Sequence, residues 1–179
     1  MDLATHYLQD SIRLFAYQKG QVERALEQLE DKDLNHAIDG ESNSIATIIQ
    51  HLYGNMRSRW SNFLGSDGEK ANRKRDDEFL ARDWAKGDLL ELWQQGWEYL
   101  FTALERLNGD DLLKEIVIRQ EPHTVLQAIE RQKEHYAMHC GQIIFLAKHL
   151  KGQDWQSITV PKGKSVGFKG NYLTTHVRT

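Results

Sequence analysis

The sequence predicts an all-α protein built from four long helices. Apolar residues recur every three or four positions through four long segments, which is the helical period. The chain also holds only two prolines, a residue that interrupts helices. An alternating, strand-like pattern appears only at 115–118, where a short extended piece could join two helices. With 179 residues, the chain is long enough for one domain with a substantial core.

The first two helices are expected at residues 3–30 and 45–63. The apolar residues of the first follow alternating steps of four and three, the spacing of a core-facing stripe: Leu8, Ile12, Phe15, Val22, Leu26 and Leu29. The second helix follows the polar run 42–44, any residue of which could cap it, and it is expected to end before Gly65.

The third and fourth helices are expected at about 85–108 and 122–151. The third is followed by Gly109, and glycine is common just after a helix because it adopts left-handed backbone angles. The fourth has Pro122 in its first turn, where no backbone N–H is needed, and it is expected to end before Gly152. Three of the four helices are therefore expected to end at a glycine.

The second and third helices are joined by a polar connection of nearly twenty residues, 65–83. Its balanced charge run, 69–78, is interpreted as a solvated surface. A connection of this length can cross the bundle, so that the next helix runs parallel to the one before it. We therefore expect an up-down-down-up four-helix bundle over residues 1–152, with a tail, 153–179, that packs on the bundle or trails from it.

Composition and charge argue against several classes of function. The net charge is −3, with 23 basic residues scattered among 26 acidic ones, so no nucleic-acid partner is expected. No apolar run is long enough to span a membrane. The first residues carry no basic region followed by an apolar stretch, so we expect no secretory signal and a cytoplasmic location. A single cysteine excludes an intramolecular disulfide and a cysteine-rich zinc module.

Three histidines form the candidate metal site. His135 and His139 are four residues apart on the fourth helix, so their side chains leave one face about one turn apart and can reach one ion. His51 occupies a similar setting on the second helix and could supply a third ligand. The alternative is that His51 is a partly buried histidine with an ordinary hydrogen bond. His123, in the first turn of the fourth helix, is interpreted as an exposed or local polar residue and not as a ligand. The remaining histidines have no partner at ligand spacing: His6, His36, His149 and His176.

Two further residue types, cysteine and tryptophan, bear on the site. Cys140 lies on the apolar stripe of the fourth helix, about 100° around the helix from His139, so it is interpreted as a small buried hydrophobe. A nucleophilic cysteine is the alternative. The five tryptophans are interpreted as core or lid residues, although Trp60 and Trp97 could line a pocket.

The chain resembles the DinB-like (YfiT-like) superfamily, specifically a bacterial branch known only as a domain of unknown function. Four segments carry the resemblance: 44–46, 51–60, 66–70 and 135–143. It implies an up-down-down-up four-helix bundle that holds a divalent ion, zinc or nickel in relatives, through His51, His135 and His139. Relatives of known activity use a low-molecular-weight thiol such as bacillithiol, mycothiol or glutathione, and they often form homodimers.

The expected reaction is a metal-dependent S-transfer from such a thiol to a small electrophile. Three neutral imidazoles leave a coordination position open, and a divalent cation lowers the pKa of a thiol that enters it. Two alternatives stay open: a metal-dependent hydrolase, and a non-catalytic metal-binding bundle associated with stress. The metal side of the second and fourth helices offers Asn55, Gln132 and Gln142 but no acid, which counts against a hydrolase.

Overall fold

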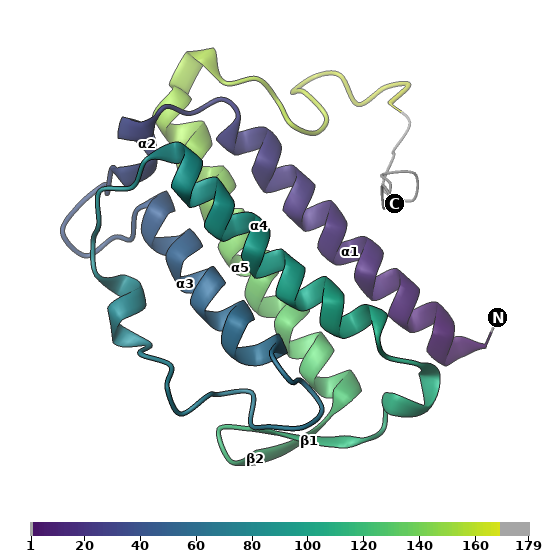
Figure 1. Ribbon diagram of the computed structural model, residues 1–179. Coiled ribbons are helices and arrows are strands. Elements are labelled where there is room, and N and C mark those ends of the chain that lie inside the picture. The colour runs from purple at the N-terminus through teal and green to yellow at the C-terminus, as the bar shows by residue number, and fades with distance from the viewer. Residues whose placement is uncertain (1, 169–179) are drawn as a thin grey trace.

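The computed structural model describes residues 2–168, and this part of the chain is mostly helical (Figure 1). Its α-helices are α1 (Leu3–Leu26), α2 (Asp31–Asn35), α3 (Ile45–Trp60), α4 (Lys86–Glu105) and α5 (Val125–Lys151). The antiparallel strands β1 (Glu115–Ile118) and β2 (Glu121–Thr124) form a small sheet. Three 3₁₀ turns complete the described chain: η1 (Asp76–Phe79), η2 (Gly109–Asp111) and η3 (Gly152–Asp154).

Four long helices, α1, α3, α4 and α5, share one apolar core (Figure 1). Large aromatic side chains meet at its centre: the ring of Trp97 lies 6.2 Å from that of Phe15 and 5.8 Å from that of Tyr136, measured between centroids. Trp97 is fully buried, so it is a core residue and not part of a pocket wall. None of the helices in the described range is long and apolar enough to cross a membrane.

The contacts between α3 and α4 show that these helices run in the same direction. Near their starts, the Trp84 indole N–H donates to Oε1 of Gln50, at 3.1 Å. Further along, Gly96 packs against Met56, and at the end Trp60 and Tyr99 line one cavity. The segment between the helices therefore returns along the length of the molecule (Figure 1).

Two of the three glycines expected to end helices do not do so. Gly152 follows α5 directly and has φ +54, as predicted. However, α3 ends at Trp60, and it is Asn62, not Gly65, that adopts a positive φ of 47°. Similarly, α4 ends at Glu105, and Gly109 begins a separate 3₁₀ turn. The apolar spacing that continued past both helix ends belongs to irregular segments that still pack on the core.

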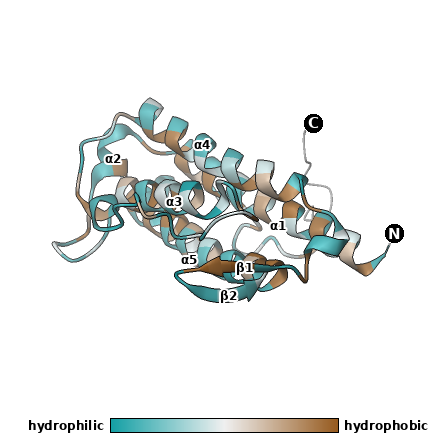
Figure 2. Cartoon of the chain, turned by 60° about the horizontal axis from the view of Figure 1, so that its bottom comes forward, coloured by the Kyte–Doolittle hydropathy of each residue, from teal (hydrophilic) through white to brown (hydrophobic). Residues whose placement is uncertain are grey.

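The start of the last helix also differs from the prediction. Pro122 lies in β2, opposite Val117 of β1, and not in the first turn of a helix. The true N-cap is Thr124, whose hydroxyl accepts a hydrogen bond from the N–H of Gln127, at 3.1 Å. The extended piece expected at 115–118 is confirmed as β1, which is the more hydrophobic of the two strands (Figure 2).

The first part of the tail packs on the helices. Gln28 and Gln156 exchange two hydrogen bonds: the N–H of Gln156 donates to Oε1 of Gln28 at 2.9 Å, and Nε2 of Gln28 donates to the carbonyl of Gln156 at 3.0 Å. Trp155 and Ile158 lie partly buried against the core. The expectation for the rest of the tail, 169–179, lies outside the described residues.

Candidate metal centre

The structure brings the three predicted histidines together between α3 and α5. Nε2 of His135 lies 3.4 Å from Nε2 of His51 and 3.2 Å from Nε2 of His139. All three ligand atoms lie within 4.8 Å of one another, an arrangement that could hold a metal ion. His51 is 4% exposed, and the other two are half-buried. His123 lies on β2 and is not part of this group.

Hydrogen bonds on the far side of two rings determine which nitrogen atoms face the centre. Nδ1 of His51 lies 2.9 Å from Oε2 of Glu78, and Nδ1 of His139 lies 2.8 Å from Oε1 of Gln142. Carboxylate and amide oxygens can only accept, so both Nδ1 atoms carry the hydrogen. When these two rings are neutral, their Nε2 lone pairs converge on His135, whose Nε2 hydrogen can serve one of them at most. A shared cation satisfies all three.

The spacing of the nitrogen atoms fits a tetrahedral ion. Imidazole nitrogens bind zinc at about 2.0–2.1 Å, which places neighbouring ligand atoms of a tetrahedron roughly 3.3 Å apart. The two separations around His135, 3.4 Å and 3.2 Å, fall on either side of this value. The residues present therefore fit a divalent ion with three imidazole ligands.

The surroundings favour the neutral, metal-binding form of the rings. Burial, together with weaker repulsion from the neighbouring His139 and His51, lowers the pKa of His135 to about 3. Burial also lowers the pKa of His139, although its hydrogen bond to Gln142 opposes the shift. Metal binding at these two rings therefore does not have to displace a proton near neutral pH.

The long connection before α4 supplies an acid that sequence reasoning missed. Glu78, on η1, is buried beside His51, and Phe79 stacks on the same imidazole with ring centroids 4.7 Å apart. The interpretation of 69–78 as a solvated surface is wrong for Glu78, although several neighbours are exposed. The apolar Phe79, directly after this charge run, is the sequence signal that the segment packs.

Arg73 holds the Glu78 carboxylate in place. Nε and Nη2 of Arg73 each donate to one oxygen of Glu78, both at 2.7 Å, and Nη1 donates to Glu69 at 3.0 Å. Burial raises the pKa of Glu78, but the hydrogen bonds from Arg73 and His51 outweigh it and hold the pKa below its usual value. Glu78 is thus an ionised carboxylate that orients a metal ligand, as outer partners of metal-bound histidines commonly do.

A glycine on α3 makes room for this carboxylate. A Cβ built on Gly54 would lie 2.5 Å from Cδ of Glu78, much closer than non-bonded carbon atoms approach. Gly54 therefore allows Glu78 to lie against the helix and reach His51.

Gly54→Ala is expected to weaken metal binding at least tenfold, because the methyl group displaces Glu78 from His51. Alanine would otherwise stabilise a helix by about 1 kcal/mol relative to glycine. Gly141→Ala is the matched control, because a Cβ there meets no atom of residues 2–168 within 4 Å. Competition with a coloured chelator measures both affinities, and equal zinc affinity in the two variants would contradict the role given to Glu78.

The register between α3 and α5 is held by a buried hydrogen-bond chain. The Tyr136 hydroxyl donates to Oδ1 of Asn55 and accepts from the indole N–H of Trp60, both at 3.0 Å.

Cys140 is buried as predicted, and burial raises the pKa of its thiol to about 12. The thiol therefore stays protonated at neutral pH and is a poor nucleophile.

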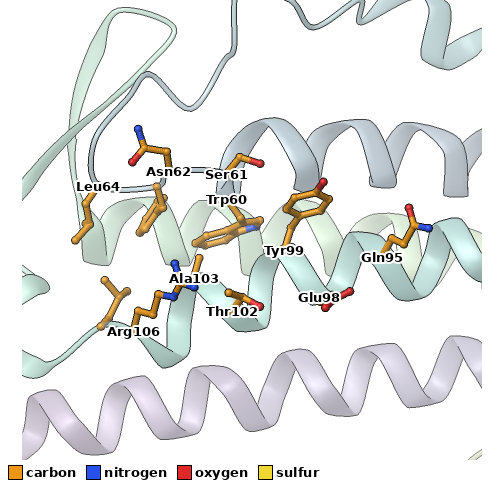
Figure 3. A pocket seen from close by; sticks show the side chains of 12 residues that line it. Trp60, Ser61, Asn62, Leu64, Gln95, Glu98, Tyr99, Thr102, Ala103 and Arg106 are labelled. Atoms are coloured by element: carbon orange, nitrogen blue, oxygen red, sulfur yellow. The ribbon is translucent and has the colours of Figure 1, made fainter.

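Two of the cavities near these elements bear on the predicted residues. One, of about 480 Å³, adjoins the histidines and is lined by His51 and His135. The other, of about 730 Å³, lies between the end of α3 and α4 and contains none of the three histidines (Figure 3). Trp60 and Tyr99 line this larger cavity, so the expectation of a pocket is met for Trp60 and not for Trp97.

One family model matches the chain over residues 2–164, and its description reads "Protein of unknown function (DUF1572)". No curated protein and no solved structure matches the chain.

Proposed function

The chain belongs to the DUF1572 family of proteins of unknown function, and we propose that it is a metal-dependent protein that holds one divalent ion, zinc or nickel, on His51, His135 and His139. The convergence of the three Nε2 atoms carries this proposal, because the hydrogen bonds to Glu78 and Gln142 leave two lone pairs that the one His135 hydrogen cannot both satisfy. Neutral imidazole is the form that binds zinc and nickel.

The proposal extends to the fold and the superfamily. We take the four long helices as the up-down-down-up bundle of the DinB-like superfamily, with the segment 61–85 as the crossover. The parallel contacts of α3 with α4 support this topology. The antiparallel arrangement of α3 and α5 also supports it: His51 contacts His139, and Trp60, nine residues later on α3, contacts the earlier Tyr136. We also propose that the protein forms a homodimer in the cytoplasm. Light scattering in solution tests the dimer.

The proposed reaction is transfer of a low-molecular-weight thiol to a small electrophile. A divalent ion with three protein ligands supplies an open position at which the pKa of a bound thiol falls. Glu78 and Gln142 hold two of the ligands, and the adjoining cavity gives small molecules access. Because a thiolate is already a nucleophile, S-transfer needs no general base.

A hydrolase is a weaker candidate because it needs a proton acceptor near the ion. Glu78 is engaged by Arg73 and His51, and its lowered pKa makes it a poor base. The exposed Glu134 lines the same cavity and is the acid that a hydrolase would have to use. Turnover of a hydrolysable ester without any thiol, lost in Glu134→Gln, would favour this alternative.

Turnover with monochlorobimane is expected to require both the ion and a thiol. The zinc- or nickel-loaded protein is assayed with bacillithiol, mycothiol, glutathione and cysteine, each with and without a chelator. His139→Ala should lower product formation at least a hundredfold, whereas Cys140→Ser should keep most of it because Cys140 is buried. Chelator-resistant turnover that Cys140→Ser abolishes would instead identify a cysteine nucleophile. No turnover with any thiol would reject the S-transferase reaction.

A further inference from the structure

The cavity beside the histidines is rich in positive charge. Its wall includes Glu134 as an acid and five arginines: Arg59, Arg73, Arg75, Arg119 and Arg131. Neither the net charge of −3 nor the scattered sequence positions of these arginines indicates such a concentration. A cavity lined by charges of one sign favours small molecules of the opposite sign.

Some of these arginines already have partners. Arg73 binds Glu78 and Glu69, and Nε of Arg119 lies 3.4 Å from Oε2 of Glu69. Arg75 lies over the ring of Phe79, 5.1 Å from its centroid. The other two, Arg59 and Arg131, form no ion pair within residues 2–168.

Arg59 is the unusual member of the group. It is only 3% exposed, yet its Nε and Nη1 atoms have no hydrogen-bond partner in the described structure. Burial lowers the pKa of Arg59 to about 10, so the side chain is still charged at neutral pH. A buried charge without a partner destabilises a fold, and it is rarely retained without a compensating ligand.

A second buried polar atom lies in the same wall. Gln132 is 1% exposed, and its Oε1 atom also lacks a hydrogen-bond partner in this part of the chain. Both Arg59 and Gln132 line the cavity that His51 and His135 line. The unpartnered groups therefore lie along one cavity that leads to the candidate metal centre.

The long connection encloses Arg59 as well as His51. A Cβ on Gly68 would lie 2.6 Å from Nη1 of Arg59, so glycine allows the guanidinium to lie under the loop. Ser58 fixes the loop there, because its hydroxyl donates to the carbonyl of Gly68 and accepts from the N–H of Lys70. The long connection therefore shapes the cavity both beside His51 and beside Arg59.

We propose that Arg59 and Arg131 bind the carboxylate or phosphate group of a small molecule whose other end reaches the three histidines. His51 and Arg59 lie two turns apart on one face of α3, about 12 Å along the axis. The ligand is therefore an elongated anion. The position of its reacting end rests on the proposed function, whereas the anion site itself does not.

The test measures anion binding by protein stripped of metal and dialysed. Succinate and inorganic phosphate are titrated calorimetrically at constant ionic strength, with choline chloride as the cationic comparison. At least one anion should bind, and its dissociation constant should rise at least tenfold in Arg59→Met and in Arg131→Gln. Arg57→Gln is the matched control, since Arg57 lies on the same helix but is exposed and lines a different cavity. The two anions distinguish a carboxylate site from a phosphate site.

Thermal unfolding without ligand separates a binding role from a structural one. Arg59→Met should unfold at the same temperature as wild type or higher, because it removes an unpartnered buried charge. A lower unfolding temperature, no binding of either anion, or equal weakening in Arg57→Gln would overturn the anion site. If the wild-type protein binds an anion but binds neither zinc nor nickel, the proposed function is overturned and the anion site is not.

Discussion

His135→Ala is expected to lose nearly all of the bound divalent ion. Nε2 of His135 is the atom that lies 3.4 Å and 3.2 Å from the other two ligand atoms, so its removal leaves two imidazoles without a common third. Wild-type protein loaded with zinc and dialysed should hold about one ion per chain. Elemental analysis of the dialysed variants measures the loss.

His123→Ala is the control for this experiment, because His123 lies on β2 outside the cluster. Its zinc content should equal that of wild type. Circular dichroism should show that His135→Ala keeps its helices, since the apolar core holds them together. Unchanged zinc content in His51→Ala, His135→Ala and His139→Ala alike would show that the site is wrong.

Glu78→Ala is expected to have the second largest effect, on both stability and metal affinity. It leaves Arg73, whose side chain is 4% exposed, with Glu69 as its remaining partner. Removing one member of a buried ion pair costs about 3 kcal/mol in free energy of unfolding. It also frees the His51 ring, and loss of such an outer partner weakens metal binding by about 10- to 100-fold.

Asp77→Ala is the matched control for Glu78→Ala. Asp77 lies in the same 3₁₀ turn but is exposed. Denaturant unfolding and zinc competition should therefore give values close to wild type. If Asp77→Ala and Glu78→Ala behave alike, the loop is a solvated surface and does not support the metal centre.

Local sequence patterns were enough to predict the helices but not their ends. The 3.6-residue period of Leu8, Phe15 and Val22 reports a buried helix face, and all three residues are buried. A glycine reports only that a left-handed conformation is available. At Gly152 the chain uses it, whereas at Gly109 the helix has already ended.

The candidate site, too, could be predicted only in part from local sequence patterns. The four-residue spacing of His135 and His139 placed both rings on one face. The position of His51 on the second helix made it a candidate third ligand, which the resemblance reinforced. The supporting residues, Glu78 and Arg59, could not be found by spacing. Their roles depend on how the 65–83 connection folds back on α3, a long-range contact that helical periodicity does not encode.

In the proposed metal centre, three Nε2 atoms hold one ion while the Nδ1 hydrogens of His51 and His139 are donated to Glu78 and Gln142. Long-range ¹H–¹⁵N spectra of the histidine rings in zinc-loaded protein test it most directly, because they distinguish the two ring nitrogens. We expect His51, His135 and His139 to show metal-shifted Nε2 signals, with protonated Nδ1 in His51 and His139. Ligation through Nδ1, or Nε2 signals that do not change on addition of zinc, would show that the three Nε2 atoms do not hold the ion.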